Sequence, residues 1–302
     1  MPEARHAPMN ESLAERMRAF TESLQVEICG ALERLDGSGR FREDDWERPG
    51  GGGGRSRVLE EGAVFEKAGV NASAVYGELS EAFASRMPGE GRAFFAAGIS
   101  LVLHPRSPLV PTTHANLRYL EHGPKAWFGG GADLTPYYLF DEDAAHFHRT
   151  LKEACDRHGA DRYPRFKKWC DEYFWLRHRG EARGVGGVFF DNLEGDLERE
   201  LRFVQDLGRA LLPAYLPIVE RRHALPYSPE ERGWQEIRRG RYVEFNLVSD
   251  RGTTFGLETQ GRVESILMSL PPRVRWVYDH QPAPGSEESR LVEVLRAPRE
   301  WA

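Results

Sequence analysis

The sequence predicts an α+β protein, built around a large and mainly antiparallel β-sheet in a single domain. Two patterns lead to this class. Strand-like segments occur in runs, with helix-like segments grouped between the runs instead of alternating with single strands. No internal repeat or linker divides the 302 residues. We therefore expect residues 1–10 to form a flexible tail and residues 11–302 to form a single domain.

The N-terminal part is predicted to hold a helix and then a loop. Ser12 and Glu15 fit a capping box, and apolar residues recur after them at helical spacing, so we expect a helix over 11–35. The stretch 36–55 is rich in Gly, Asp and Arg and includes the run Gly50–Gly54. We expect a flexible loop there, because the glycines are not followed by the signature of a phosphate-binding loop.

The middle of the chain is predicted to alternate between a run of strands and a pair of helices. Strand-like segments are expected at 64–75, 94–104, 112–121 and 125–128, and a further strand at 185–190. One helix starts near Asp141, a good N-cap residue, and ends near Gly159. The next has Pro164 in its first turn and Gly180 beyond its end, the usual asymmetry of helix termini.

The last third of the chain has a mixed pattern. Helices are expected at 196–222, where two prolines disturb the helix, and at 229–239 and 286–296. Segments that look extended or mixed are 242–248, 253–258, 264–270 and 274–278.

Composition and charge exclude several classes of protein. Hydrophobic residues make up 40% and charged residues 29%, as in soluble globular proteins. The net charge of −6 argues against a nucleic-acid binder, which needs a basic surface. The three cysteines form no paired motif, which fits a reducing compartment. No run of apolar residues has the length of a membrane span, and we expect a cytoplasmic protein.

The strongest local signal for a site is the segment 113–119. On a strand, His114, Asn116 and Arg118 lie on one face and are spaced about 6.5 Å apart. The neighbouring predicted strand brings Ser100 and His104 to the same surface. A solvated polar face remains the alternative interpretation of this pattern.

Histidines are concentrated in the same region. On the helix near 141–159, His148 is expected to point inward and His146 toward water, since two residues apart is about 200° on a helix. His178 shares a stripe with buried-type residues of the next predicted helix. Histidines on four elements could bind a divalent metal, but their spacing matches no compact metal motif.

A run of glycines precedes an acidic residue in 129–136. We expect a turn there, in which the glycines allow close approach of a bulky group. Asp133 is then either a turn-forming residue or a carboxylate presented to an N–H group of a ligand. Gly184–Gly187 does not continue as a dinucleotide-binding fingerprint, since Phe189 takes the place of a glycine.

Taken together, four segments closely resemble the oxygen-dependent coproporphyrinogen III oxidases of haem biosynthesis. They are GISLVLHPRSPLVPTTHANLRYLE (98–121), WFGGGADLTPYYLFDEDAAHFHRT (127–150), YPRFKKWCDEYFWLRHRGEARGVGGVFFDNL (163–193) and GRYVEFNLVSDRGTTFGLETQGRVESILMSLPPRVRWVYD (240–279). The resemblance extends over about 11–301. It implies a large antiparallel sheet sandwiched between helices. It also implies oxidative decarboxylation of two propionates of coproporphyrinogen III to vinyl groups, giving protoporphyrinogen IX.

The resemblance also implies cofactors and partners. Oxygen is the co-substrate, carbon dioxide and hydrogen peroxide are products, and no flavin, haem or nicotinamide takes part. Some bacterial members are described with a divalent metal cation. A homodimer is implied, with 242–277 in its interface, where Val243, Phe245, Leu247 and the run 266–270 are apolar.

Site residues follow from the same resemblance. It places substrate contacts at Ser100, Asn116, Leu117, Arg118, Gln260, Gly261 and Arg262. It places metal ligands at His104, His114, His148 and His178. His114, Asp133 and Arg262 are the catalytic candidates, with Asp133 polarising pyrrole N–H groups, Arg262 holding the reacting propionate and His114 transferring a proton. The family commonly has Gly-Gly-Arg where this chain has Gln260-Gly261-Arg262.

Two other functions remain open at this stage. A metal-dependent hydrolase would use the histidines and a carboxylate that activates metal-bound water. A tetrapyrrole carrier would bind the same macrocycle without consuming oxygen.

Overall fold

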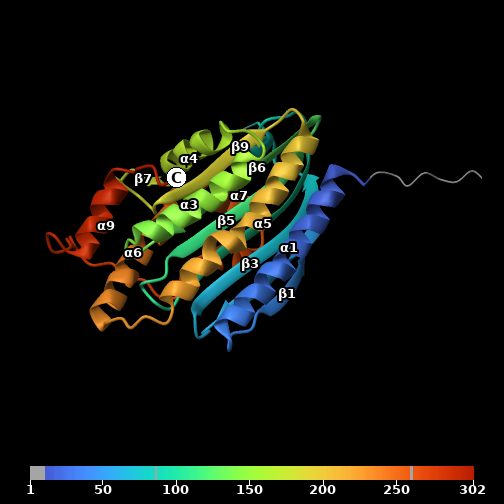
Figure 1. Cartoon of the computed structure of the whole chain (residues 1–302). Coiled ribbons are helices and arrows are strands. Elements are labelled where there is room, and N and C mark those ends of the chain that lie inside the picture. Colours follow the sequence, from blue (N-terminus) through green and yellow to red (C-terminus); the bar gives the residue numbers. More distant parts are fainter. Residues whose placement is uncertain (1–10, 86, 259–260) are drawn as a thin grey trace, which may run out of the picture.

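The protein is built on a seven-stranded antiparallel sheet with the strand order β1-β2-β3-β4-β5-β6-β9 (Figure 1). The structure is a computed structural model and describes residues 11–85, 87–258 and 261–302. The sheet strands are β1 (Arg42–Glu47), β2 (Gly52–Glu60), β3 (Phe65–Glu78), β4 (Ala93–Pro105), β5 (Thr112–His122), β6 (Lys125–Thr135) and β9 (Gly186–Leu193). A second, short ribbon pairs β7 (Trp175–Leu176) with β8 (Glu181–Ala182). The predicted α+β class is confirmed, while the predicted tail over 1–10 lies outside the described residues.

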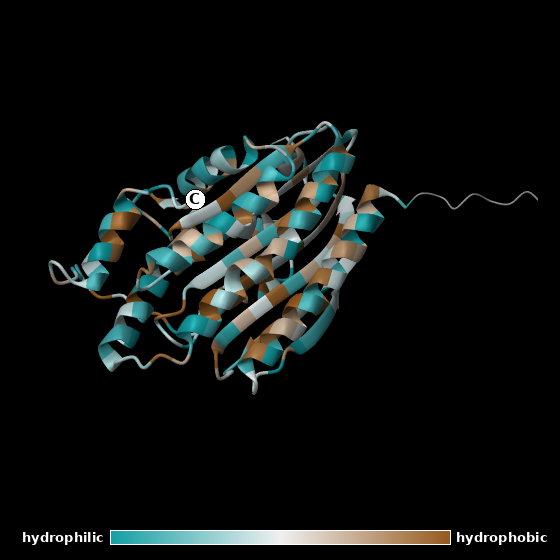
Figure 2. Ribbon diagram, viewed as in Figure 1, coloured by the Kyte–Doolittle hydropathy of each residue, from teal (hydrophilic) through white to brown (hydrophobic). Residues whose placement is uncertain are grey.

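Helices cover both faces of the sheet. The helices are α1 (Leu13–Asp36), α2 (Glu81–Ala84), α3 (Asp141–Asp156), α4 (Arg162–Tyr173), α5 (Leu197–Arg222), α6 (Pro229–Val248), α7 (Arg251–Glu258), α8 (Val263–Leu267) and α9 (Glu287–Arg296). Figure 1 shows α1, α5 and α3 side by side across one face. We call this the helical face. In Figure 2 these helices carry both hydrophilic and hydrophobic residues along their length, as amphipathic helices do.

The main core lies between the sheet and the helical face. On β5, Ala115, Leu117 and Tyr119 alternate with the polar residues and are almost completely buried there. They pack with residues of α1 and α5 such as Leu24 and Leu207. Burying one face of each strand in this way fixes the pairing register, because a slip of one residue would turn these side chains outward.

Two prolines lie inside α5 without ending it. Pro217 has no N–H, so it leaves the carbonyl of Pro213 without its helical partner. His146 of α3 supplies the missing donor, with its Nε2 atom 3.0 Å from that carbonyl oxygen. The prediction that His148 points inward is confirmed, since it is fully buried, whereas His146 is half-buried and contacts α5 instead of only water.

The prediction of a flexible loop over 36–55 is wrong. Residues 42–47 and 52–60 form the edge hairpin β1–β2, and the glycines Gly52–Gly54 belong to β2. Space explains why small residues stand here. A Cβ atom on Gly54 would lie 2.5 Å from the Trp46 ring and 2.6 Å from the carbonyl oxygen of Ala72. The glycines therefore permit close strand pairing, and composition alone did not separate this role from that of a loop.

The expected turn at 129–136 is also wrong. β6 continues through Gly129–Gly131 to Thr135, so Asp133 lies on a strand paired with His114 of β5 and Gly187 of β9. The predicted strand at 125–128 was correct but too short. Just before β9, Gly184 packs directly against Leu134 and Thr135 at the end of β6, where a Cβ atom would lie 2.2 Å from the carbonyl oxygen of Leu134.

The C-terminal third is more helical than predicted. α6 extends to Val248, so 242–248 is not extended, and 253–258 and part of 264–270 are helical in α7 and α8. The second predicted helix ends earlier, because α4 stops at Tyr173 and His178 lies in the turn between β7 and β8. Helices predicted at 11–35, 196–222 and 286–296 are confirmed.

Candidate active site

The second face of the sheet carries polar residues and glycines in register. Directly paired residues on neighbouring antiparallel strands point to the same face. One row across the sheet contains Asp44, Ser56, Asn71, Ser100, Asn116 and Gly131. The next row along the strands contains Gly69, Val102, His114, Asp133 and Gly187. We call this surface the polar face.

A buried ion network occupies the polar face at β5 and β6. Asp133 is 2% exposed, and its two carboxylate oxygens accept hydrogen bonds from Nη2 of Arg183 at 2.8 and 2.7 Å. Nδ1 of His114 lies 2.8 Å from Oδ1 of the same carboxylate. Because Nδ1 must donate to an ionised carboxylate, the Nε2 atom of His114 is left to face other partners.

The environment keeps Asp133 ionised. Burial alone would raise its pKa, but the charge of Arg183 and the hydrogen bond from His114 outweigh burial and lower the pKa below its ordinary value. A carboxylate with a lowered pKa is a weak base. Asp133 is therefore suited to accept hydrogen bonds and to stabilise positive charge, and less suited to remove a proton completely.

Arg183 is enclosed by aromatic rings and an amide. Its guanidinium carbon lies 4.0 Å from the ring centre of Phe174, 4.6 Å from Tyr242 and 4.8 Å from Phe245. Its Nη1 donates to Oδ1 of Asn246 at 3.0 Å. Within the described residues its buried Nε has no hydrogen-bond partner. Cation–π contacts of this kind stabilise a guanidinium that has lost its water.

The sequence did not single out Arg183, Asn246, Phe174 or Tyr242. Arg183 stands next to a Gly-rich strand start, and the other residues come from the end of α4 and from α6. A buried Arg needs an acidic partner, but nothing in the chain order indicates that Asp133 is that partner. The tertiary fold brings them together, because Arg183 lies between β8 and β9, and β9 pairs with the strand of Asp133.

Asn116 and Arg118 lie beside this network on the same strand. Nη1 of Arg118 donates to Asn116 Oδ1 at 3.0 Å, and Nη2 lies 3.0 Å from Oδ2 of Asp191. Arg118 is partly exposed, so its charge is accessible from the polar face. A Cβ atom on Gly129 would lie 2.4 Å from Asp191 Oδ1 and 2.9 Å from Arg118 Nε, so glycine leaves room for this ion pair.

The other predicted substrate contacts are distributed along the polar face and beyond it. Ser100 is half-buried and pairs with Asn116. Leu117 points to the opposite, helical face and is fully buried, so only its backbone could touch a ligand on the polar face. Gln260 lies outside the described residues.

Arg262 stands apart from Asp133 in this structure. It precedes α8 and forms an ion pair with Asp44 of β1, whereas Asp133 belongs to β6, five strands further along the sheet. Gly261 lies next to it and packs near Ile266. The structure thus brings together His114 and Asp133, and it does not bring Arg262 to them.

The four predicted metal ligands occupy separate places. His104 is buried on the polar face and lies 3.2 Å from Thr112 Oγ1 and 2.8 Å from the Ser269 carbonyl oxygen. His148 lies on the helical side and is 2.9 Å from the hydroxyl of Tyr163. His178 contacts Oε2 of Glu244 at 2.8 Å.

These histidines are fitted to hydrogen bonding. Burial lowers the pKa of His148 to about 3 and that of His104 well below its ordinary value, so both are neutral. Each of the two rings is occupied at both nitrogens, as the distances show. No cluster of three His, Cys, Asp or Glu side chains that could hold a metal occurs in the described ranges. The residues present therefore do not fit the expected metal site.

Fold and site together define an α+β protein whose antiparallel sheet carries a buried carboxylate–guanidinium–imidazole centre on its polar face. The chain matches the family model for coproporphyrinogen III oxidase over residues 16–301 and belongs to that family. It is 53% identical over 312 residues to an oxygen-dependent coproporphyrinogen-III oxidase, chloroplastic, of Glycine max. That alignment covers 98% of this chain and 81% of the relative.

A human relative gives the same result. The chain is 53% identical over 302 residues to the mitochondrial oxygen-dependent coproporphyrinogen-III oxidase of Homo sapiens. The alignment covers 95% of this chain and 66% of the human protein, so the chain spans about two thirds of that relative's length.

Proposed function

We propose that this protein is an oxygen-dependent coproporphyrinogen III oxidase. It converts two propionate side chains of coproporphyrinogen III to vinyl groups. Each propionic acid loses its carboxyl group as carbon dioxide and one further hydrogen from the carbon next to the pyrrole ring. The two electrons and two protons so released reduce one oxygen molecule to hydrogen peroxide. The observation that carries this proposal is 53% identity to enzymes of that name over nearly the whole chain.

The geometry supports a role for Asp133 as an acceptor of pyrrole N–H groups. Its carboxylate is ionised and held on the polar face by Arg183 and His114. A macrocycle lying against this face would direct its N–H groups to a fixed negative charge, which stabilises positive charge as it develops on the electron-rich rings. Nδ1 of His114 contacts Asp133, so its Nε2 atom is placed to give or take a proton next to the Asp133 carboxylate.

Arg118 and its neighbours are suited to hold propionates. A guanidinium binds a carboxylate through two parallel hydrogen bonds, and Arg118 is the partly exposed guanidinium adjacent to the Asp133 network. Asn116 and Ser100 add polar groups on the same row. We also keep Arg262 as a holder of the reacting propionate. In that role it must leave Asp44 and approach the centre of the sheet when substrate binds.

No step of this mechanism uses a metal. The histidines expected to bind one are hydrogen-bonded to other protein groups at separate positions, so the chain's own residues are assigned the binding and proton-transfer steps. Oxygen acts directly on the bound, electron-rich macrocycle.

The test compares aerobic and anaerobic turnover of coproporphyrinogen III, with metal-free enzyme and oxidised products separated by chromatography. We expect protoporphyrinogen formation, carbon dioxide release and oxygen uptake only in air. A hydrolase would be indifferent to oxygen, and a carrier would leave the substrate unchanged. Either result would overturn the proposal.

A homodimeric, cytoplasmic enzyme completes the proposal. The three cysteines are buried and unpaired, as expected in a reducing compartment. Among the described residues no helix is long and apolar enough to cross a membrane. The plant and human relatives are named chloroplastic and mitochondrial, so fractionation of the source cells is the direct test of location.

A further inference from the structure

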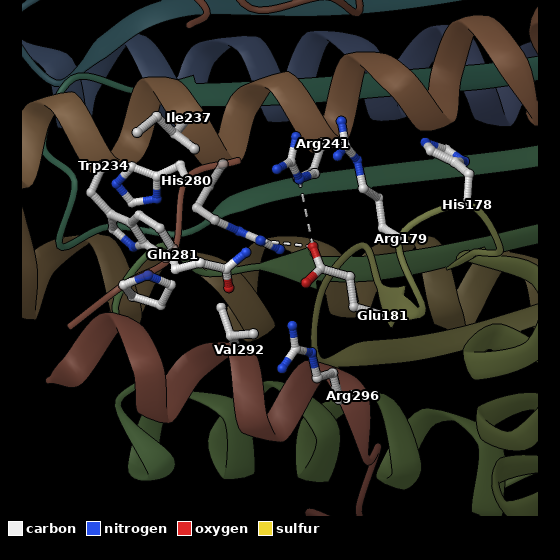
Figure 3. A pocket seen from close by; sticks show the side chains of 12 residues that line it. His178, Arg179, Glu181, Trp234, Ile237, Arg241, His280, Gln281, Val292 and Arg296 are labelled. Carbon is white, nitrogen blue, oxygen red and sulfur yellow. Dashed lines mark hydrogen bonds and ion pairs between the residues drawn. The ribbon is translucent and has the colours of Figure 1, made fainter. Parts of the chain in front are cut away.

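A second charged pocket lies between α6, α9 and the β7–β8 turn (Figure 3). Its volume is about 180 Å³. Guanidinium groups dominate its wall: Arg179, Arg238, Arg241 and Arg296. Figure 3 shows Glu181 between Arg241 on one side and Arg296 on the other. The mechanism proposed above uses none of these residues.

The positive charges of the pocket are not fully matched by protein groups. Glu181 binds Arg238 at 2.7 Å and lies 3.8 Å from Arg241. Glu244 pairs with Arg179 and Arg241 from the side. Three of the four guanidinium groups therefore share these two carboxylates, and within the described part of the chain Arg296 forms no ion pair with either of them. Burial and the repulsion of Arg179 and Arg238 also lower the pKa of Arg241, although Glu244 acts in the opposite direction.

Arg238 supplies an independent sign that a ligand is missing. It is 4% exposed, and only its Nη1 atom is held by Glu181. Its buried Nη2 atom has no hydrogen-bond partner among the described residues. A buried donor without a partner costs free energy, and an arginine fork with one free arm is the usual receptor for an oxyanion.

We propose that this pocket binds a small oxyanion, a carboxylate or a phosphate, through Arg238 and Arg296. The volume is well below that of pockets for drug-sized ligands, so it does not accommodate a whole tetrapyrrole. The oxyanion is either a free small anion or one propionate arm of the substrate. The chemistry of recognition is the same in both cases.

Titration calorimetry on the full chain without substrate tests a free anion. The probes are inorganic phosphate and succinate, with sodium chloride at equal ionic strength as the control for screening. We expect saturable binding of at least one probe and none of chloride. Arg238→Gln and Arg296→Gln each weaken that binding by on the order of tenfold to hundredfold, because each removes a charged hydrogen bond.

Arg209→Gln is the matched control, since Arg209 is an exposed arginine on α5. It leaves anion binding unchanged. Arg296 is itself exposed on α9, so its variant keeps the test decisive if Arg238→Gln fails to fold.

Steady-state kinetics distinguish the propionate arm. If the arm is the ligand, both pocket variants raise KM for coproporphyrinogen about tenfold or more while kcat stays near the wild-type value. The proposal is overturned if neither probe binds and KM is unchanged in both variants. It is also overturned if binding survives both substitutions. None of these anion-binding measurements depends on whether the enzyme decarboxylates its substrate.

Discussion

The buried negative charge of Asp133 is compensated by Arg183. The order of residues along the chain does not reveal that these two residues are partners. The sequence singled out Asp133, His114 and Arg118 as candidate residues, and strand alternation placed His114 and Arg118 correctly on one face. It missed Arg183, because the partner of a buried carboxylate depends on which strands lie side by side. The turn expected at Asp133 was wrong as well, yet the carboxylate still faces the predicted surface.

Asp133→Asn tests the assigned role directly. The amide keeps the shape but removes the negative charge that receives pyrrole N–H groups. We expect kcat to fall by on the order of 10²–10⁴, with a smaller effect on KM. Steady-state oxygen uptake measures both. Asp156→Asn on the outer side of α3 is the control. Turnover near the wild-type rate would return Asp133 to a purely structural role.

Arg183→Met tests the other half of the pair. Removing the guanidinium leaves Asp133 buried without its main partner, which costs about 3–5 kcal/mol of folding free energy. Urea denaturation at pH 7 measures the loss. Arg209→Gln, an exposed arginine, changes the free energy of unfolding by less than about 1 kcal/mol. Equal stability of Arg183→Met and wild type would contradict the assignment of a buried ion pair.

At the scale of elements, short polar contacts fix how helices join the sheet. Asp36, the last residue of α1, accepts hydrogen bonds from the backbone N–H groups of Gly39, Ala63, Val64 and Phe65 at 2.6 to 2.9 Å. One carboxylate thus ties the end of α1 to the turn before β3. Burial alone would raise the pKa of Asp36, but these bonds outweigh it and lower the pKa.

Asp36→Ala is expected to destabilise the fold by about 2–4 kcal/mol, since it leaves several backbone donors unsatisfied. Asp45→Ala is the matched control, because Asp45 is exposed and forms a surface ion pair with Arg55, worth at most about 1 kcal/mol. Urea unfolding curves of the two variants give the comparison. Similar losses of unfolding free energy for both variants would show that the hydrogen bonds to Asp36 do not stabilise the fold more than a surface ion pair does.

Glu244 joins α6 to the β7–β8 turn. Burial alone would raise its pKa, but hydrogen bonds from Arg179 and His178 and the charge of Arg241 outweigh burial and lower the pKa from 4.5 to about 2. A carboxylate whose pKa is lowered by folding stabilises the fold above its unfolded pKa, and this contribution is lost as the pH falls through the folded value.

We therefore expect Glu244→Gln to cost up to about 3 kcal/mol at pH 7. The difference from wild type remains down to about pH 5 and shrinks as the pH approaches 2. Urea unfolding at a series of pH values measures it, with Glu220→Gln as an exposed control. A difference that stays constant over the acidic range would refute the coupling.

Prediction from sequence succeeded where a single period dominates a segment. In β5 apolar and polar residues alternate, and in α1 and α5 the apolar residues recur every three or four positions. It failed for α6 beyond residue 239, because Gly240 is followed by Tyr242, Val243 and Phe245, residue types that also favour strands. It failed for β1 and β2 because glycines that permit tight pairing look like those of a loop.

For the whole molecule, the segment 242–277 is expected to form the dimer interface. The structure shows that some apolar residues of this segment are buried within the protomer and others are exposed. Val243 and Phe245 are buried inside the protomer, whereas Leu247, Val248, Val263 and Trp276 are between 47% and 72% exposed. Exposed apolar residues gathered in one segment favour association.

Light scattering at micromolar concentration should give twice the mass of the 34.3 kDa chain. Leu247→Asp combined with Val248→Asp should shift the protein to a monomer, because each charge would be buried in the interface. Tyr227→Asp, at an exposed position before α6, is the control. A wild-type monomer that is fully active would rule the interface out.

The two faces of β5 divide the work of one strand between neighbouring residues. Ala115, Leu117 and Tyr119 support the core, while His114, Asn116 and Arg118 meet the substrate side. Replacing each residue from 114 to 119 in turn should therefore have two different effects, which alternate along the strand. Cellular abundance falls at odd-numbered positions, and specific activity falls at even-numbered ones. Inherited or laboratory variants at residues 114 to 119 would be sorted into unstable proteins and stable but inactive ones by the parity of the residue number alone.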